Sequence, residues 1–108
     1  MKNLEFTYGG APAGVALDFT FSPSKALRVH SIDFHSSDYI LSGEYSIKLD
    51  SSSGEVHDSI LYSGDVTGTK GYSKEFTNRY LSNGDSIVVS CPATPAVSYG
   101  VCFVTETL

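Results

Sequence analysis

Apolar and polar residues alternate along this chain in short runs, and no stretch keeps the 3.6-residue period of an amphipathic helix. Gly, Pro, Asn and Ser separate the runs, as is typical of connections between short strands. We therefore expect an all-β fold, a single antiparallel β-sandwich of about eight strands that is jelly-roll-like. The strands are predicted at residues 4–8, 15–21, 26–35, 44–50, 56–63, 72–77, 87–91 and 99–104.

Residues 80–91 are predicted to form a turn that leads into a buried strand. Asn83 and Gly84 suit a turn that needs a positive φ, and the carboxylate of Asp85 is placed to bind the main chain of that turn. Apolar residues then occupy every second position from 87 to 91. This structural turn is therefore assigned to Asn83, Gly84 and Asp85.

The last two predicted strands are expected to pair as an antiparallel hairpin that carries Cys91 and Cys102. A turn at residues 95–98 would bring the two sulfurs close enough for a disulfide, whereas a longer loop would separate them. Two cysteines are also too few for a disulfide framework. We expect both cysteines to be reduced.

The strand at residues 26–35 has a shift in its alternation. Leu27 and Val29 lie on one face of a regular strand, and Ile32 and Phe34 lie on the other. A β-bulge near residues 30–31 would turn all four side chains inward.

The N-terminal segment allows two interpretations. Leu4, Phe6 and Tyr8 share one face of a strand, and residues 9–14 that follow are small, uncharged and rich in Gly, as in a loop or hinge. Residues 1–14 are then either an edge strand of the chain's own sandwich or an arm that joins a neighbouring subunit's sheet. The pattern slightly favours the edge strand.

Length and charge limit the classes of partner. The 108 residues form one domain, 1–108, and the net charge is −5 with the basic residues scattered, so we expect no nucleic-acid binding. No apolar run is long enough to span a membrane, and no basic-then-apolar start indicates a secretion signal.

No set of residues has the spacing of a catalytic, metal or cofactor site. His30 and His35 fall on opposite faces of a regular strand, and Glu55 and His57 lack a third ligand at fixed spacing. Residues 50–55 resemble a calcium loop only in part, and no serine lies in a Gly-x-Ser-x-Gly context. We expect no catalytic residue, no metal ligand and no cofactor.

Tyrosines near strand ends are the better functional signal, because exposed tyrosines anchor protein interfaces or stack on sugar rings. Those predicted at strand ends or beside loops are Tyr39, Tyr62, Tyr72, Tyr80 and Tyr99. With the apolar face of the N-terminal segment, the interface candidates are Leu4, Phe6, Tyr8, Tyr39 and Tyr72.

A series of spaced motifs extends over about three quarters of the chain, from residue 26 to residue 104. They are Leu27–Phe34, Tyr45–Asp50 followed by a Ser-Gly pair, Ile60–Tyr62, the aromatic Phe76, the set Leu81, Gly84, Asp85 and Ile87, and Tyr99–Val101. This pattern is similar to a group of small virion structural proteins of tailed bacteriophages. The Gly-rich stretch at 9–14 and the cysteine pair are not part of that pattern, which leaves the location within the virion open.

The resemblance implies a non-enzymatic subunit of the head, neck or tail, with a capsid decoration (cement) protein as the leading case. Such a protein is assembled in the host cytoplasm, resides in the virion and stabilises the head by multivalent contacts with major capsid or tail proteins. The resemblance also implies a homo-oligomer, with a trimer as one candidate.

The alternative is a carbohydrate-binding β-sandwich module of a tail fibre or another tail component. A glycan-binding module should gather exposed aromatic residues beside amides or carboxylates on one face. A decoration protein should carry its exposed apolar residues on edges and termini.

Overall fold

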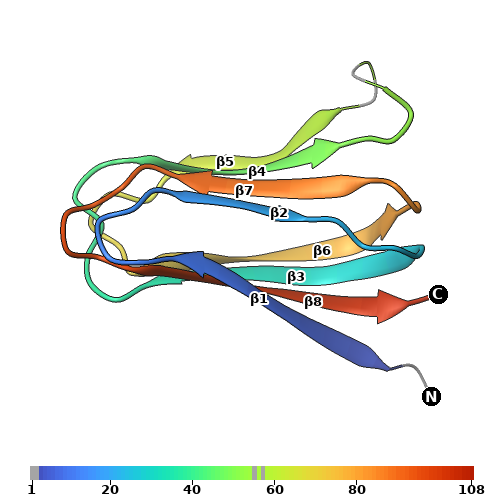
Figure 1. Ribbon diagram of the computed structural model, residues 1–108, viewed down its shortest axis with the longest axis horizontal. Helices are drawn as coiled ribbons and strands as arrows, with labels where there is room; N and C mark the ends of the chain where they lie inside the picture. Colours follow the sequence, from blue (N-terminus) through green and yellow to red (C-terminus); the bar gives the residue numbers. More distant parts are fainter. Residues whose placement is uncertain (1–2, 55, 57) are drawn as a thin grey trace.

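The computed structural model describes residues 3–54, 56 and 58–108, which form two four-stranded antiparallel sheets packed face to face (Figure 1). One sheet has the strand order β1-β8-β3-β6, and the other has the order β2-β7-β4-β5. The strands are β1 (Leu4–Ala11), β2 (Leu17–Phe21), β3 (Leu27–Ser36), β4 (Glu44–Asp50), β5 (Ser59–Asp65), β6 (Gly71–Leu81), β7 (Ser86–Cys91) and β8 (Tyr99–Thr107). We call the two sheets the β1 sheet and the β2 sheet.

The all-β sandwich expected from the alternation is confirmed. Eight strands are present, and the described residues contain no α-helix and hence no helix that could span a membrane. Consecutive strands lie in opposite sheets except for β4 and β5, which are neighbours in the β2 sheet. The finer jelly-roll assignment stays a prediction.

The connections divide between the two ends of the sandwich (Figure 1). One end carries residues 12–16, 37–43, 66–70 and 92–98, and we call it the loop end. The opposite end carries residues 22–26, 51–58 and 82–85 together with both termini.

The core lies between the sheets and is filled by every second residue of the central strands. Ile87, Val89 and Cys91 of β7 are all buried, as the period-two pattern predicts. Aromatic rings pack across the gap: Phe103 of β8 stacks on a phenylalanine of β2, and Phe34 of β3 stacks on Tyr45 of β4 with ring centroids 4.3 Å apart.

Two local predictions are confirmed. The β3 ladder shifts register between Val29 and Ser31, so the bulge turns the apolar residues on both sides of it into the core. Gly84 has φ = 97°, so the turn before β7 uses the positive φ that only glycine adopts at low cost.

The expected C-terminal hairpin is wrong. β7 pairs with β2 and β4, whereas β8 pairs with β1 and β3 in the other sheet. The connection at residues 92–98 contains two prolines and carries the chain from one sheet to the other. Cys91 and Cys102 are both free thiols, one buried in the core and one partly exposed.

Several predicted strand boundaries are also wrong. The first strand continues through Gly9 and Gly10, which were expected to begin a loop, and the sixth extends to Leu81. A side chain at Gly9 would meet the Phe19 ring at 2.6 Å, and one at Gly10 would meet the Tyr99 carbonyl oxygen at 2.3 Å. These glycines therefore serve close packing rather than a hinge.

Candidate interaction surface at the loop end

The exposed large apolar side chains avoid the centre of both sheets. Among the described residues, none lies on the four central strands β8, β3, β7 and β4. They lie instead on edge strands, on connections and at the C-terminus: Leu4, Phe6, Tyr8, Val15, Tyr39, Leu41, Val56, Ile60, Tyr80 and Leu108. Three of the ten, Val15, Tyr39 and Leu41, lie at the loop end.

The buried side chain of Tyr99 holds the connection between β7 and β8 through hydrogen bonds on the core side of that connection. Its ring is buried, and its hydroxyl donates a hydrogen bond to the carbonyl of Pro92 at 2.6 Å and lies 3.2 Å from the hydroxyl of Thr94. Thr94 is itself buried, and its hydroxyl accepts a hydrogen bond from the main-chain N–H of Leu41 at 3.4 Å. Burial raises the pKa of Tyr99, so this hydroxyl stays protonated and keeps its donor role.

Main-chain hydrogen bonds join the connections at residues 37–43 and 66–70 into one layer. The N–H of Ile40 donates to the carbonyl of Thr69 at 2.9 Å, and the N–H of Gly68 donates to the carbonyl of Ile40 at 2.7 Å. The Ile40 side chain is buried beneath this layer. A surface whose main chain is bonded in this way presents its side chains with little ordering cost on binding.

Tyr39 and Leu41, on either side of the buried Ile40, point outward from this layer. Tyr39 is 59% exposed and Leu41 is 68% exposed. The ammonium of Lys70 lies 4.8 Å from the centroid of the Tyr39 ring, which favours one orientation of the ring. Val15 is also exposed at this end, where the N–H of its neighbour Gly14 donates to the carbonyl of Val97 at 3.1 Å.

The predicted tyrosines divide into two groups. Tyr39 and Tyr80 are exposed, as expected for interface residues. Tyr72, predicted as an interface residue, instead stacks on Tyr62 with centroids 4.4 Å apart, and both rings pack against the core. Tyr62 and Tyr72 are half-buried and Tyr99 is buried. The expectation of exposure is therefore wrong for these three, which pack between the two sheets.

Leu4, Phe6 and Tyr8 are exposed on β1, which pairs with β8 of the same chain over eight residues. The structure thus places this segment as an edge strand of its own sandwich. It does not bring these residues to the loop end, because their strand runs away from it toward the two termini (Figure 1).

The turn residues act structurally, as their pattern predicts. The carboxylate of Asp85 accepts hydrogen bonds from the main-chain N–H groups of Ser82 and Ser52, each at 2.9 Å. Those bonds hold the pKa of Asp85 below its usual range. Asp85 thereby ties the connection before β7 to the connection after β4.

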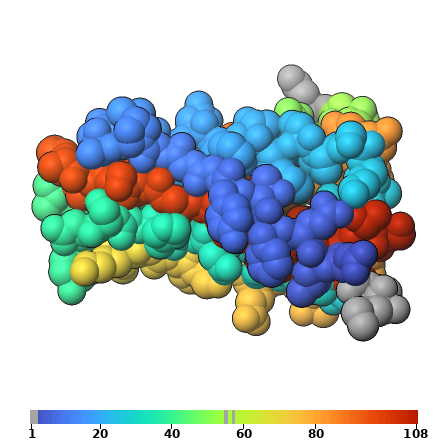
Figure 2. Space-filling model, turned by 60° about the horizontal axis from the view of Figure 1, so that its bottom comes forward, coloured from blue at the N-terminus to red at the C-terminus, as the bar shows by residue number. Residues whose placement is uncertain are grey.

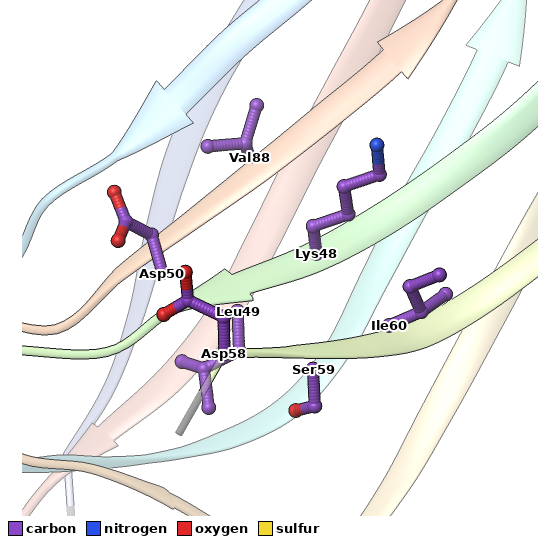
Figure 3. A pocket seen from close by; sticks show the side chains of 7 residues that line it. All are labelled: Lys48, Leu49, Asp50, Asp58, Ser59, Ile60 and Val88. Atoms are coloured by element: carbon purple, nitrogen blue, oxygen red, sulfur yellow. The ribbon is translucent and has the colours of Figure 1, made fainter. Parts of the chain in front are cut away.

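A shallow groove of about 440 Å³ lies on the outer face of the β2 sheet (Figure 3). Figure 3 shows the carboxylates of Asp50 and Asp58 on one side of it and the ammonium of Lys48 on the other. A second depression shares Lys48 and Val88 with it and extends the groove toward β2. No aromatic side chain lines either part among the described residues.

The histidines do not form a metal site within the described part of the chain. His30 Nε2 lies 2.7 Å from Oε1 of the buried Glu106, which the sequence did not single out. No group of three or more potential ligands occurs among the described residues. Glu55 and His57, which lack a third ligand at fixed spacing in the sequence, lie outside the described residues.

Leu41 and Val15 are the interface candidates that sequence reasoning missed. Val15 was predicted to begin the strand at 15–21, but β2 begins only at Leu17. The available signal was two adjacent aliphatic residues, Ile40 and Leu41, because neighbouring side chains of an extended segment point to opposite sides.

Comparison with protein-family models, curated proteins and solved structures finds no significant match to this chain.

Proposed function

We propose that this protein is a non-enzymatic virion structural protein of a tailed bacteriophage, a capsid decoration protein that binds major capsid subunits through its loop end. The observation that carries the proposal is the distribution of exposed apolar residues on edges, connections and the terminus. The motif pattern in the sequence and the order of strands in the two sheets, which is compatible with a jelly roll, support it.

Tyr39 and Leu41 act as the anchors of the contact. Burying the exposed part of each of these side chains against a capsid subunit contributes about 1–2 kcal/mol, because both are already partly covered. The hydrogen-bonded layer beneath them holds both in place before binding, so little of this free energy is lost to ordering. Many copies on a symmetric shell then make a modest single contact effective, and the capsid subunits resist separation.

A carbohydrate-binding module of the tail is the competing proposal. It calls for exposed aromatic rings gathered beside carboxylates. The groove on the β2 sheet supplies carboxylates without aromatic rings among its described lining residues, and the exposed tyrosines lie elsewhere. We therefore place the decoration proposal ahead of it.

The first test is mass spectrometry of purified virions that carry this gene product. The proposal expects the chain at high copy number relative to the major capsid protein. Absence of the chain from virions, or a copy number typical of a tail tip, overturns the assignment to the capsid.

A matched pair of variants then tests the surface. Leu41→Asp places a charge in the contact and should lower occupancy of the particles at least about tenfold. Val56→Asp is the control, because Val56 is 88% exposed at the opposite end and should leave occupancy unchanged. Equal occupancy for both variants contradicts a contact through the loop end.

A further inference from the structure

The two sheets end in four edge strands, and β1 is the least protected of them. The β6 ladder is interrupted near Asn78, which has φ = 57°, and β5 faces a register shift between Ile47 and Lys48. β2 has only five residues, and Pro23 follows it closely. β1 pairs with β8 over eight residues without a shift and contains no Pro, Lys or Arg. Bulges, prolines and lysines are the usual means of preventing edge-to-edge pairing, so β1 is open to it.

The outward side chains of β1 are apolar. Leu4, Phe6 and Tyr8 are 51%, 55% and 73% exposed. Figure 2 shows β1 in dark blue at the front of the molecule, beside β8 in red, with no other segment covering it in this view. Its C-terminal half lies near β2, whereas its N-terminal half runs away from β2 and stays paired with β8 (Figure 1). Leu4 and Phe6 lie in the N-terminal half, which is therefore free on one side, and Tyr8 follows directly after it.

The edge is also electrically balanced. Glu5 is the only charged residue of β1, and its carboxylate accepts a hydrogen bond from the hydroxyl of Thr107 at 2.7 Å and lies 3.0 Å from the ammonium of Lys25. A strand edge with net charge repels an identical edge across a twofold axis. The Glu5–Lys25 pair removes that obstacle for a second copy of the same chain.

We propose that this edge binds a second copy of the chain through antiparallel pairing of the two β1 strands about a twofold axis at Phe6. In this register Phe6 faces Phe6 of the second copy, Leu4 faces Tyr8, and Glu5 faces Thr7. Every apolar residue thus meets an apolar residue. A register shifted by two residues toward the N-terminus places the two Glu5 side chains opposite each other, which is unfavourable. The same shift toward the C-terminus leaves Leu4 opposite Gly10, without an apolar partner. The two β1 sheets become one continuous eight-stranded sheet.

The dimer is weak and depends on salt. A contact made by two short strands is smaller than the roughly 1,000 Å² that stable interfaces exceed. Each copy also has a net charge of −5, so the two copies repel each other until salt screens them. We expect the dimer to dissociate at low micromolar protein concentration and to associate more tightly when salt is added. A dimer held by opposite charges would instead weaken when salt is added.

Sedimentation velocity of the full chain tests the proposal, from micromolar to millimolar concentration in about 0.05 M and about 0.5 M salt. Phe6→Lys and Phe6→Glu should each be monomeric, with the dissociation constant raised at least tenfold, because like charges face each other across the axis. An equimolar mixture of the two variants should dimerise, because Lys then faces Glu. Tyr80→Lys is the control, since Tyr80 is 51% exposed on the β6 edge and should leave the dimer intact.

Thermal unfolding establishes whether each variant is folded. We expect all of them to fold, because the side chains of Phe6 and Tyr80 are both exposed. The proposal is overturned if the wild-type chain stays monomeric at millimolar concentration, or if its dimer weakens with salt. It is equally overturned if Phe6→Lys still dimerises, as an exchange of β1 between copies would allow, or if the charged mixture stays monomeric.

Discussion

At the scale of single residues, two buried tyrosines show how differently one core treats the same side chain. The hydroxyl of Tyr99 donates to the Pro92 carbonyl, whereas the hydroxyl of Tyr45 has no hydrogen-bond partner among the described residues. Burial raises the pKa of Tyr45, so this hydroxyl stays neutral, and its ring stacks on Phe34. The ring of Tyr45 therefore contributes to stability and its hydroxyl does not.

Replacing each tyrosine by Phe should separate these roles. Tyr45→Phe should leave the free energy of unfolding unchanged or raise it by up to about 1 kcal/mol, because it removes a buried polar group without a partner. Tyr99→Phe should lower it by about 1–2 kcal/mol, because the Pro92 carbonyl loses its donor. Urea denaturation measures both, and equal effects of the two substitutions would contradict the assignment.

Gly84 tests the turn before β7. Gly84→Val should lower the free energy of unfolding by about 1–3 kcal/mol. Valine at this position would have to adopt φ = 97°, and its Cβ would lie 3.0 Å from the Cβ of Ser52. Gly54→Val is the control, because Gly54 has φ = 106° but no neighbour within 4 Å, so it should cost only the backbone strain. A denaturation midpoint unaltered by Gly84→Val would mean that the turn tolerates a side chain.

At the scale of elements, the edge strand and the paired connections show that segments far apart in sequence stabilise each other. β1 covers one side of β8, whose inward residues Val101 and Phe103 are in the core. Asp85 joins the connection at 82–85 to the connection at 51–58. Removing either element should affect more than its own residues.

Deletion of residues 1–10 should destabilise or precipitate the protein. It removes the partner strand of β8 and turns β8, which has inward residues in the core, into an unpaired edge strand. Deletion of residues 1–3 is the control, because it leaves β1 complete. Thermal unfolding and size-exclusion chromatography measure the outcome, and a truncated chain that stays folded and monomeric would favour the interpretation of this segment as an arm.

The link made by Asp85 should depend on pH. Because the main-chain N–H groups of Ser52 and Ser82 lower the pKa of Asp85, the folded state binds its proton less tightly than the unfolded chain does. Its contribution is therefore complete above a pH of about 4 and is lost as the pH falls through the lower folded-state value. Asp85→Asn should lower the urea midpoint at neutral pH, and the difference from wild type should shrink toward a pH of about 3. The control is Asp18→Asn, at an exposed position on β2, which should change the free energy of unfolding by less than about 0.5 kcal/mol at either pH. An effect of Asp85→Asn that does not depend on pH would contradict the role of the Asp85 charge.

At the scale of the whole molecule, stability comes from the core between two sheets. The core contains aromatic stacks that bridge the sheets, and both cysteines are free. The chain is long enough to bury such a core without a metal or a disulfide.

Chelation should therefore leave stability unchanged. An excess of EDTA should not shift the melting temperature of the purified protein, because no group of three potential ligands occurs among the residues that the structure describes. The control is the same measurement after addition of zinc and of calcium. A drop of several degrees with EDTA would reveal a structural metal.

Local alternation was enough to determine which segments of this protein form strands, although not where each strand begins and ends. A period of two places Ile87 and Val89 on one face wherever the strand lies, and the predicted bounds of β4, Glu44–Asp50, agree with the structure. The bulge in β3 and the positive φ at Gly84 were also predicted from the sequence, because each depends on neighbouring residues alone. Of the candidate surface, Tyr39 was predicted on the same local basis.

Only the tertiary structure decided which strands are neighbours and which side chains those neighbours cover. The hairpin expected for β7 and β8 was wrong because a short connection fits a crossing between sheets as well as a turn within one. Tyr72 and Tyr99 are covered because the second sheet lies against them, whereas Leu4, Phe6 and Tyr8 stay exposed because their strand is at an edge. Exposure depends on the packing of distant segments, and no local pattern contains that information.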